Sequence, residues 1–301
     1  KQQERVIIRS KKCMNTKLVD WIVVQDRDPD NLPSRNTDTT VLLSDIRGFT
    51  SLSEDMPSQS VTGFLTGLNE ALAQPLFVAE DQGHIAYTDK FMGDAVMNIF
   101  NNPHIALETA IRIRIQLQKF NDNPAAFFPA APPGMHVDIG IGIASGPVTL
   151  GVMGHSRRLD YTPIGDTVNM ASRLESLTKE YHAPILVNDV LYRSIRPEDF
   201  HLRHIDRIRV KGKMHPVDIY EEFSCDLPEV QSLKNEALIR FLELQEMYFA
   251  GKNWEDAIHL AEFLAQKGDP VAQIYGRRMR AISASPDLLA HWDGVYTFSE
   301  K

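Results

Sequence analysis

The sequence is short of cysteine, of long apolar runs and of any excess of basic residues. Only Cys13 and Cys225 occur among 301 residues, and their spacing fits no metal-ligand motif. So few cysteines are typical of a reducing compartment, and we expect a cytoplasmic location. No apolar stretch approaches the roughly 20 residues that a membrane-spanning helix needs.

The balance of charge is acidic. Lysine and arginine total 32 against 40 aspartate and glutamate residues, which gives a formal net charge of −8. The chain therefore has no overall positive field to attract nucleic acid or an anionic membrane surface, and we expect no nucleic-acid partner. A polyphosphate ligand would have to be held by a few local cations and a metal ion.

The chain begins with Lys1-Gln2-Gln3-Glu4, without an initiator methionine or a signal-peptide pattern. We therefore expect it to follow an upstream regulatory domain of the same protein. That protein would be cytoplasmic, or this chain would be the cytoplasmic portion of a larger, membrane-anchored one. Residues 1–37 are expected to hold a short amphipathic helix and a polar linker.

Two further regions follow this N-terminal segment. Within residues 38–224 helices and strands mix without strict alternation. This favours an α+β domain, with a mainly antiparallel sheet and flanking helices, over a doubly wound sheet. Residues 225–301 are expected to form a small all-α C-terminal extension with three helical segments. Because one such unit cannot bury its own face, we expect it to pack on the main domain or on a second copy. Four of its residues have the spacing of half a tetratricopeptide repeat: Tyr248, Gly251, Trp254 and Ala257.

Hydrophobic periodicity and turn residues predict the individual elements. A helix beginning near Ser60 is expected to bury a face made of Val61, Phe64, Leu65, Leu68, Leu72 and Leu76. The hairpin turn between the second and third strands is expected to contain Lys90 and Gly93-Asp94, and residues 153–160 are expected to form a polar arm. The other helices are expected at 105–120, 165–181, 230–250, 253–266 and 270–283. Strands are expected at 39–44, 84–88, 95–100, 136–145, 146–152, 185–188, 202–210 and 217–223.

Two aspartates stand at the ends of apolar runs that are typical of strands. Asp45 follows the run 39–43, and Asp94 precedes the run 95–100. Carboxylates that converge across neighbouring strands make an oxygen-rich site for divalent cations. Such a pair can hold two metal ions about 3.5–4 Å apart, an arrangement that clamps the attacking and leaving oxygens of a phosphoryl transfer.

Polar side chains also share one face of the helix expected at 165–181. Asn169 and Arg173 are four residues apart, so they project from the same side. Taken alone, they are an ordinary surface cation and a polar residue near a helix start. The opposite, buried face is expected to hold Val168, Ala171 and Leu174.

Four segments occur in the order and approximate spacing of the class III nucleotide cyclases: SDIRGFT, DKFMGD, YTPIGDTVNMASRLE and VKGK. Through them, residues 38–223 resemble that family, although each segment alone is a weak signal. The resemblance implies a ferredoxin-like, palm-like fold. It also implies the conversion of ATP to 3′,5′-cyclic AMP and pyrophosphate, by attack of the ribose 3′-hydroxyl on the α-phosphate.

The same resemblance implies roles for individual residues. Asp45, Asp94 and the backbone carbonyl of Ile46 would bind two Mg²⁺ or Mn²⁺ ions per site. Asn169 would orient the ribose, and Arg173 would stabilise charge at the α-phosphate. Backbone N–H groups would cradle the terminal phosphates, and a lysine would neutralise the triphosphate. These phosphate contacts are expected from Arg47, Gly48, Phe49, Thr50 and Lys211.

Base selection is expected from Lys90 and Thr162. A lysine can only donate hydrogen bonds, so Lys90 suits the unprotonated N1 of adenine and conflicts with the N1–H of guanine. The Thr162 hydroxyl can accept from the adenine amino group, but it can also donate, so it discriminates less. Guanylate-specific members of the family typically carry an acid at the lysine position, which favours ATP as the substrate here.

In this family the metal aspartates come from one subunit, and the base, ribose and charge-stabilising residues come from the other. Because one chain here carries the whole set, the resemblance implies a head-to-tail homodimer with two shared sites. The alternatives are a guanylate cyclase, a diguanylate cyclase and a catalytically silent module that dimerises or binds nucleotide. A diguanylate cyclase lacks support because the hairpin reads Met92-Gly93-Asp94-Ala95 in place of Gly-Gly-acid. The silent module is disfavoured because the metal aspartates and the Asn/Arg pair are all present.

Overall fold

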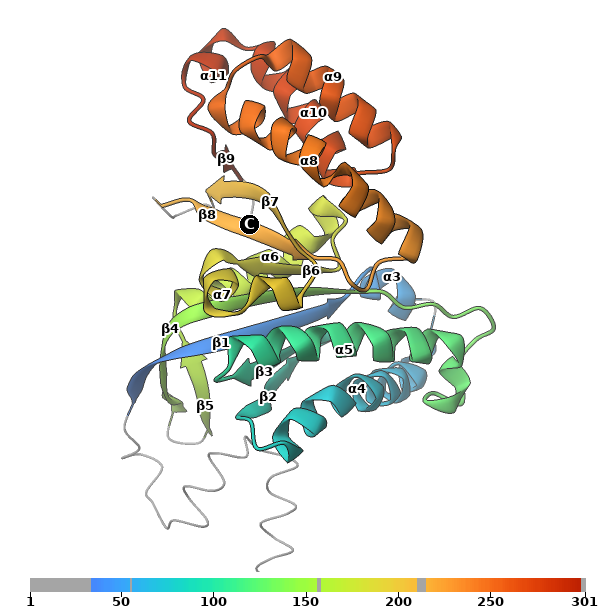
Figure 1. Cartoon of the computed structure of the whole chain (residues 1–301). Helices are drawn as coiled ribbons and strands as arrows, with labels where there is room; N and C mark the ends of the chain where they lie inside the picture. Colours follow the sequence, from blue (N-terminus) through green and yellow to red (C-terminus); the bar gives the residue numbers. More distant parts are fainter. Residues whose placement is uncertain (1–33, 55, 156–157, 210–214, 299–301) are drawn as a thin grey trace, which may run out of the picture. The chain divides into compact units, whose positions relative to one another are not determined.

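A computed structural model describes residues 34–54, 56–155, 158–209 and 215–298 of the chain (Figure 1). Contacts between residues group the chain into two compact units, with the boundary between Glu175 and Ser176. Of the N-terminal region expected at 1–37, only residues 34–37 are among those described. None of the helices in the described part of the chain combines the length and the apolar character needed to cross a membrane.

The first unit is built on an antiparallel sheet (Figure 1). Its strand order is β2-β3-β1-β4, and β5 pairs with β4. The pairings β1–β3, β1–β4, β2–β3 and β4–β5 are all antiparallel, which confirms the expected α+β class. The strands are β1 (Arg35–Ile46), β2 (Ala86–Met92), β3 (Ala95–Phe100), β4 (Ile139–His155) and β5 (Arg158–Ile164).

Strand β1 is central because it pairs with β3 along one edge and with β4 along the other. Its run Val41-Leu42-Leu43 is buried, so both faces of the strand are covered, and the run accordingly lacks polar alternation. The strand is longer than the expected 39–44. Its ladder with β4 extends from Arg35 opposite Leu150 to Ile46 opposite Ile139.

Helices α4 (Ser58–Asp81) and α5 (Pro103–Asp122) pack side by side in this unit (Figure 1). Phe64 of α4 meets Phe120 of α5 edge to face, with 6.4 Å between the ring centroids. The N-terminus of α5 is capped by Asn102, whose side chain accepts from the first free backbone N–H groups. The chain also forms α3 (Phe49–Glu54) between β1 and α4, and a short 3₁₀ turn (Pro124–Ala126) after α5.

The buried face of α4 differs from the expected one. At Gly67 the helix lies very close to the chain around Phe127: a Cβ atom added to Gly67 would lie 2.3 Å from the carbonyl oxygen of Phe127. Only a residue without a side chain fits at this point of the buried face. This close approach rotates the buried stripe toward Gly67, so three residues of the expected face are only partly covered: Val61, Leu65 and Leu72. The buried stripe consists of Phe64, Gly67, Leu68, Ala71, Pro75, Leu76 and Ala79.

Helix α6 (Asp166–Tyr181) packs tightly on β4. A Cβ atom added to Gly142 of β4 would lie 2.1 Å from the backbone nitrogen of Glu175 and 2.3 Å from the carbonyl oxygen of Ala171. Any side chain at position 142 would therefore push the helix away from the strand. This glycine sets the depth at which the N-terminal half of α6 lies on the sheet.

Two local predictions in the first unit were partly wrong. The hairpin turn is formed by the predicted Gly93 and Asp94, with Gly93 in the left-handed region at φ 72°, but Lys90 lies within β2. The stretch expected as a polar arm is paired: β4 and β5 continue their ladder as far as His155 opposite Arg158. The backbone hydrogen bonds between β4 and β5 therefore extend into this stretch although its sequence is polar.

The second unit carries strands in the order β6-β8-β7-β9. They are β6 (Ile185–Asn188), β7 (Leu202–Arg209), β8 (Val217–Glu222) and β9 (Tyr296–Thr297), of which β9 runs parallel to β7. The expected helices are present as α8 (Pro228–Ala250), α9 (Trp254–Gln266) and α10 (Pro270–Ser283). Three elements of this unit were not predicted, since they are too short to show a period: α7 (Asp189–Ser194), α11 (Pro286–Ala290) and β9. A 3₁₀ turn spans Pro197–Asp199.

Buried ion pairs connect the helices of this unit to its strands. Arg203 on β7 donates to Glu221 on β8 and to Asp269, the N-cap of α10, at 2.5 Å each. These three side chains are at most 1% exposed. Lys234 on α8 donates to Glu221 at 2.9 Å. Helices α8 and α10 are therefore held to the strands by charges that water does not screen.

We expect Arg203→Met to lower the free energy of unfolding by roughly 3–5 kcal/mol, because two buried carboxylates would lose a shared cation. Urea unfolding followed by circular dichroism measures this difference. Arg277→Met is the matched control, since Arg277 pairs with Glu180 while 68% exposed. An exposed pair contributes less than about 1 kcal/mol. A similar decrease in the free energy of unfolding in the two variants would contradict a structural role for the buried ion pairs of Arg203.

Candidate active site

The first group of candidate residues lies where β1 ends and the β2–β3 hairpin turns. Asp45 is the penultimate residue of β1, and its neighbour Ser44 pairs with Val96 of β3. This register brings the carboxyl group of Asp45 into hydrogen-bond contact with Asp94, which directly precedes β3. Burial, followed by the charge and the hydrogen bond of Asp94, raises the pKa of Asp45 to about 6.

A converging pair of carboxylates fits a divalent cation. The two like charges repel each other in a half-buried position, and a bound cation would remove that repulsion. The described part of the chain places no cluster of three or more His, Cys, Asp or Glu side chains that could hold a metal. Mg²⁺ does not require one, since it is usually bound by one or two carboxylates together with substrate phosphates. The predicted additional ligand, the carbonyl of Ile46, belongs to the last residue of β1.

The turn after β1 carries residues that were predicted to contact phosphates. Gly48 adopts φ +68°, a left-handed conformation that favours glycine, and α3 begins at Phe49. Arg47 is held differently from the prediction: its backbone N–H donates to the carbonyl of Asp138 at 2.9 Å. Its Nε atom also lies 3.2 Å from Oδ2 of Asp138. The N–H of Arg47 is thus used within the protein, which leaves Gly48, Phe49 and Thr50 for the predicted phosphate contacts.

Helix α6 separates a polar face from a buried one, as its sequence predicts. Asn169 is exposed and Arg173 is half-buried. The hydroxyl of Thr167 donates to the carbonyl of Pro147 at 2.9 Å, which fixes the first turn of the helix. The buried face holds Ala171, Leu174 and the partly buried Val168.

Lys90 and Thr162 come together at a residue that sequence reasoning missed. The hydroxyl of Thr162 donates to Oδ2 of Asp89 at 2.8 Å, and Nζ of Lys90 lies 3.4 Å from the same oxygen. The side chain of Asp89 is 1% exposed. Burial raises its pKa, while the hydrogen bond from Thr162 and the charge of Lys90 lower it. The one signal in the sequence was an acid directly before Lys90, in a stretch that folds as a strand.

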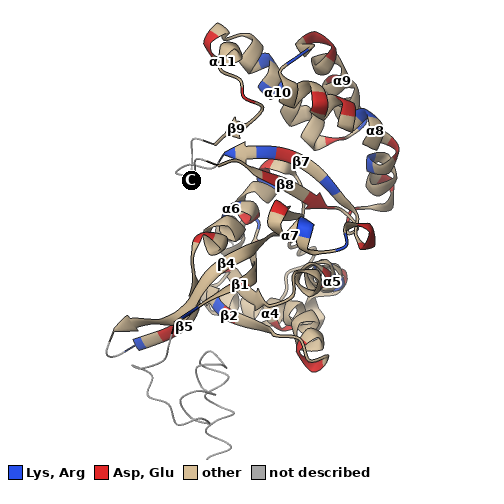
Figure 2. Cartoon of the chain, turned by 60° about the vertical axis from the view of Figure 1, so that its left-hand side comes forward, with Lys and Arg blue, Asp and Glu red and all other residues tan. Residues whose placement is uncertain are grey.

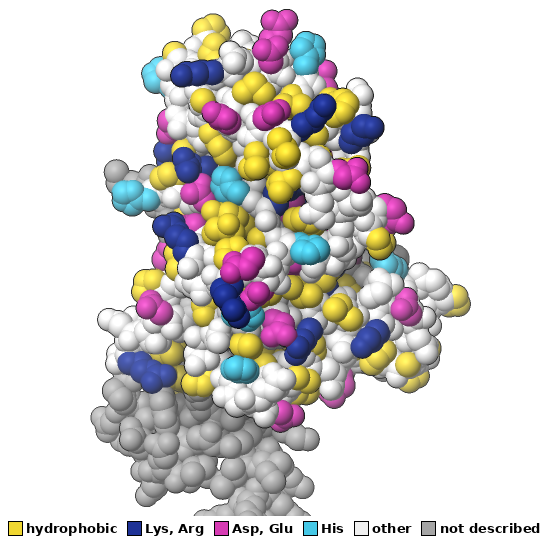
Figure 3. All heavy atoms as spheres, in the orientation of Figure 1, with side chains coloured by type: hydrophobic (Ala, Val, Ile, Leu, Met, Phe, Trp, Pro, Cys, Tyr) yellow, Lys and Arg dark blue, Asp and Glu magenta, His cyan; other side chains and the backbone are white. Residues whose placement is uncertain are grey.

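The described residues thus place three groups in the first unit: the acids at the end of β1, the set around Asp89, and the polar face of α6. Lys211, predicted to neutralise the triphosphate, lies outside the described residues. Basic and acidic residues are interspersed along the ribbon, and β5 carries both signs (Figure 2). Charged and apolar side chains also alternate over the face in Figure 3, so the described residues on this face form no surface of a single charge sign.

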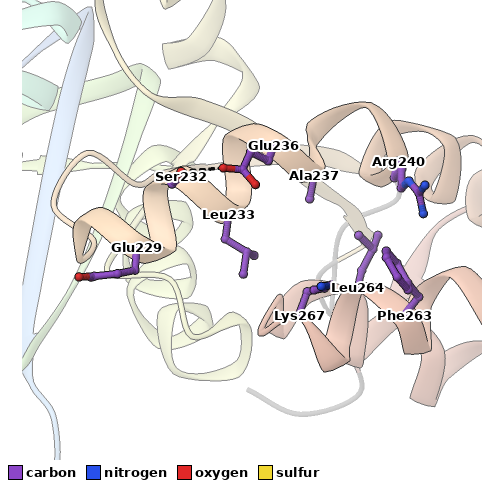
Figure 4. Close-up of a pocket in the computed structure, with 9 residues that line it drawn as sticks. All are labelled: Glu229, Ser232, Leu233, Glu236, Ala237, Arg240, Phe263, Leu264 and Lys267. Atoms are coloured by element: carbon purple, nitrogen blue, oxygen red, sulfur yellow. Dashed lines mark hydrogen bonds between the residues drawn. The ribbon is translucent and has the colours of Figure 1, made fainter.

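Two depressions in the second unit are lined by none of the predicted site residues. One, of about 530 Å³, lies between α8 and α9, where the guanidinium of Arg240 stands 5.0 Å from the ring centroid of Phe263 (Figure 4). The other, of about 650 Å³, lies between the C-terminal half of α6 and α10 and is lined in part by Lys179 and Arg277.

The antiparallel α+β sheet, together with the order of the motifs on it, defines a nucleotide-cyclase type of domain. Residues 33–221 match the family described as "Adenylate and Guanylate cyclase catalytic domain". The chain belongs to this family.

Several relatives are named adenylate cyclases. The chain is 41% identical over 187 residues to one from Anabaena cylindrica, a match that covers 60% of this chain and 36% of that protein. It is 34% identical over 217 residues to the terminal-differentiation specific enzyme of Dictyostelium discoideum, covering 69% of this chain and 10% of that protein. The chain therefore spans only a part of the length of these relatives. The crystal structure of the adenylyl cyclase CyaB from P. aeruginosa matches with a TM-score of 0.54 and 32% identity, over 64% of this chain and 97% of that chain.

The raised pKa of Asp45 predicts a pH-dependent cost in the metal-free protein. Its folded pKa of about 6 exceeds the ordinary 3.8, so the folded state binds the proton more tightly, and stability falls as pH rises from about 4 to 6. We expect Asp45→Asn to raise the melting temperature at pH 8 by more than at pH 5. Differential scanning fluorimetry in the presence of a chelator measures the change in melting temperature at each pH. An equal shift at the two pH values would contradict the repulsion between Asp45 and Asp94.

Proposed function

We propose that the chain is an adenylate cyclase that converts ATP to 3′,5′-cyclic AMP and pyrophosphate. The observation that carries the proposal is the convergence of Asp45 and Asp94 within a domain of this family. A carboxyl group whose pKa is raised by burial and by a neighbouring acid, as that of Asp45 is, lowers the stability of the fold, and such groups cluster at functional sites. The relatives named adenylate cyclases support this choice of reaction.

Asp45, Asp94 and the carbonyl of Ile46 would hold two Mg²⁺ or Mn²⁺ ions per site. When bound, such ions supply Lewis acidity that makes a hydroxyl easier to deprotonate and offsets charge on phosphate oxygens. The ribose 3′-oxygen forms a bond to the α-phosphorus while the bond from that phosphorus to the β-phosphate oxygen breaks. The hydroxyl loses its proton and pyrophosphate leaves, so the reaction needs no other reactant.

The remaining residues would orient the substrate and neutralise its charge. Asn169 would hold the ribose, and Arg173, one turn further along the same face of α6, would stabilise charge that develops at the α-phosphate. Lys211 would neutralise the triphosphate. Removing one such charge-stabilising donor typically lowers turnover on the order of 10²–10³-fold. The backbone N–H groups expected at the terminal phosphates are those of Gly48, Phe49 and Thr50.

Lys90 would select adenine. Its ammonium group can only donate, so it matches the N1 acceptor of adenine and opposes the N1–H donor of guanine. A buried polar group left unpaired by the wrong substrate is what makes such discrimination large. A guanylate cyclase is therefore not favoured.

The complete site would require two copies of the chain, arranged head to tail. Large apolar side chains stand exposed next to the base-selecting residues, with Phe91 59% and Met92 44% exposed beside Lys90, and Ile164 44% exposed near Thr162. Exposed apolar groups that adjoin a site are suited to burial against a partner. Each site would then combine the acids of one copy with Lys90, Thr162, Asn169 and Arg173 of the other. An upstream regulatory domain and a cytoplasmic location belong to the same proposal.

Incubation with ATP or GTP and Mn²⁺, followed by chromatographic identification of the product, tests the activity. We expect cyclic AMP from ATP and at least tenfold less cyclic GMP from GTP. Specific activity should fall on dilution, because a monomer lacks a complete site. Cyclic GMP as the main product would indicate a guanylate cyclase, and no product from either nucleotide would indicate a silent module.

Complementation between two inactive variants tests the shared site. Asp45→Ala should abolish turnover through loss of a metal ligand, and Arg173→Ala should lower turnover on the order of 10²–10³-fold through loss of a charge-stabilising donor. Mixing them should restore up to about one quarter of the parent activity, since half of the random dimers are hybrids with one intact site each. A mixture that stays inactive, although tagged heterodimers can be isolated, would exclude a site divided between two copies.

A further inference from the structure

Asp89 has a position that the proposed mechanism does not use. It lies on β2 and its carboxylate accepts the proton of the Thr162 hydroxyl, which comes from β5, 73 residues later in the chain. The Asp89 side chain is 1% exposed and Thr162 is 3% exposed, so water competes little for this hydrogen bond. The bond therefore constrains the direction of the Thr162 hydroxyl proton as well as the position of its oxygen.

A threonine hydroxyl has one proton to donate and two lone pairs that can accept. When its proton is committed to Asp89, the Oγ1 atom can offer a ligand only a lone pair. An ionised carboxylate can only accept, so the roles in this bond cannot be exchanged. The carboxylate thus converts an ambiguous group into an acceptor.

We propose that Asp89 is a positioning residue for purine selection, which orients the Thr162 hydroxyl as an acceptor for the exocyclic amino group of adenine. This inference rests on the proposed cyclase function. Adenine presents a donor at its 6-amino group and an acceptor at N1, and Thr162 and Lys90 then offer an acceptor and a donor in the matching order. Guanine presents an acceptor at O6 and a donor at N1, so it opposes both groups.

The same carboxylate also positions Lys90, whose Nζ atom lies 3.4 Å from the oxygen that accepts from Thr162. One oxygen atom of Asp89 therefore fixes the two groups that would read the edge of the base. Lys90 alone discriminates at N1. Asp89 adds discrimination at position 6, where Thr162 without its partner would accept either base.

The test compares kcat/KM for ATP, GTP and ITP in the parent and in Asp89→Asn. ITP carries the O6 and N1–H of guanine but lacks its 2-amino group, so it isolates the edge in question. An amide at position 89 can donate to Thr162, which frees the Thr162 proton to face O6. We expect kcat/KM for ATP to fall about tenfold or more and the ratio of ITP to ATP to rise at least tenfold.

Asp160→Asn is the matched control. Asp160 is an exposed acid on β5 that pairs with Arg158 at 3.8 Å, and its replacement removes the same charge from the same region. It should leave the ratio of ITP to ATP within about twofold of the parent. Thermal unfolding of each variant shows whether its fold is retained.

A rescue variant separates orientation from simple support of the fold. In the double variant Asp89→Asn/Thr162→Asp, the amide can donate to a carboxylate that accepts without needing to be oriented, so preference for ATP should return. If Asp89→Asn alone does not fold, the double variant still tests the proposal. A double variant that folds but does not prefer ATP would overturn the proposal. An equal decrease in kcat/KM for all three nucleotides in Asp89→Asn would overturn it as well. A parent that forms no cyclic nucleotide from ATP would instead refute the proposed function.

Discussion

The repulsion between two carboxyl groups is the interaction on which the proposed site depends. Asp45 and Asp94 lie at adjacent strand ends because the β1–β3 register pairs Ser44 with Val96. Half-burial strengthens their interaction, so the metal-free domain holds an arrangement that costs stability and that a cation would relieve. In the proposed site two protein carboxylates would suffice, since substrate phosphates can complete the coordination of Mg²⁺.

The rest of the first unit keeps the other polar groups at fixed positions relative to its sheet. Gly142 lets α6 approach β4 at backbone distance, which sets the height of the face that carries Asn169 and Arg173. The bond between Asp89 and Thr162 ties β2 to β5, two strands that do not pair with each other. Rigid strands and a closely packed helix are suited to a site that must orient a nucleotide within fractions of an ångström.

The second unit shows how a short helical extension obtains a stable core. Helices α8 and α10 share buried ion pairs with strands β7 and β8, through Arg203, Lys234 and their carboxylate partners. Such pairs contribute little compared with apolar packing of the same volume, but they penalise strongly any arrangement that separates the partners. The extension therefore belongs to the same compact unit as these strands, a grouping that its resemblance to half of a helical repeat does not reveal.

Much of the fold and the chemical class of the site followed from the sequence, because hydrophobic period and strand-end acids are local signals. The helices α5, α6, α8, α9 and α10 and the acids Asp45 and Asp94 were predicted on that basis. The sequence left the role of the Thr162 hydroxyl ambiguous, and it gave no sign that Asp138 holds the backbone N–H of Arg47. Both depend on residues many positions apart that meet only when the sheet forms. The direction of a hydroxyl proton and the use of a backbone donor are properties of that contact, so only the tertiary structure decided them.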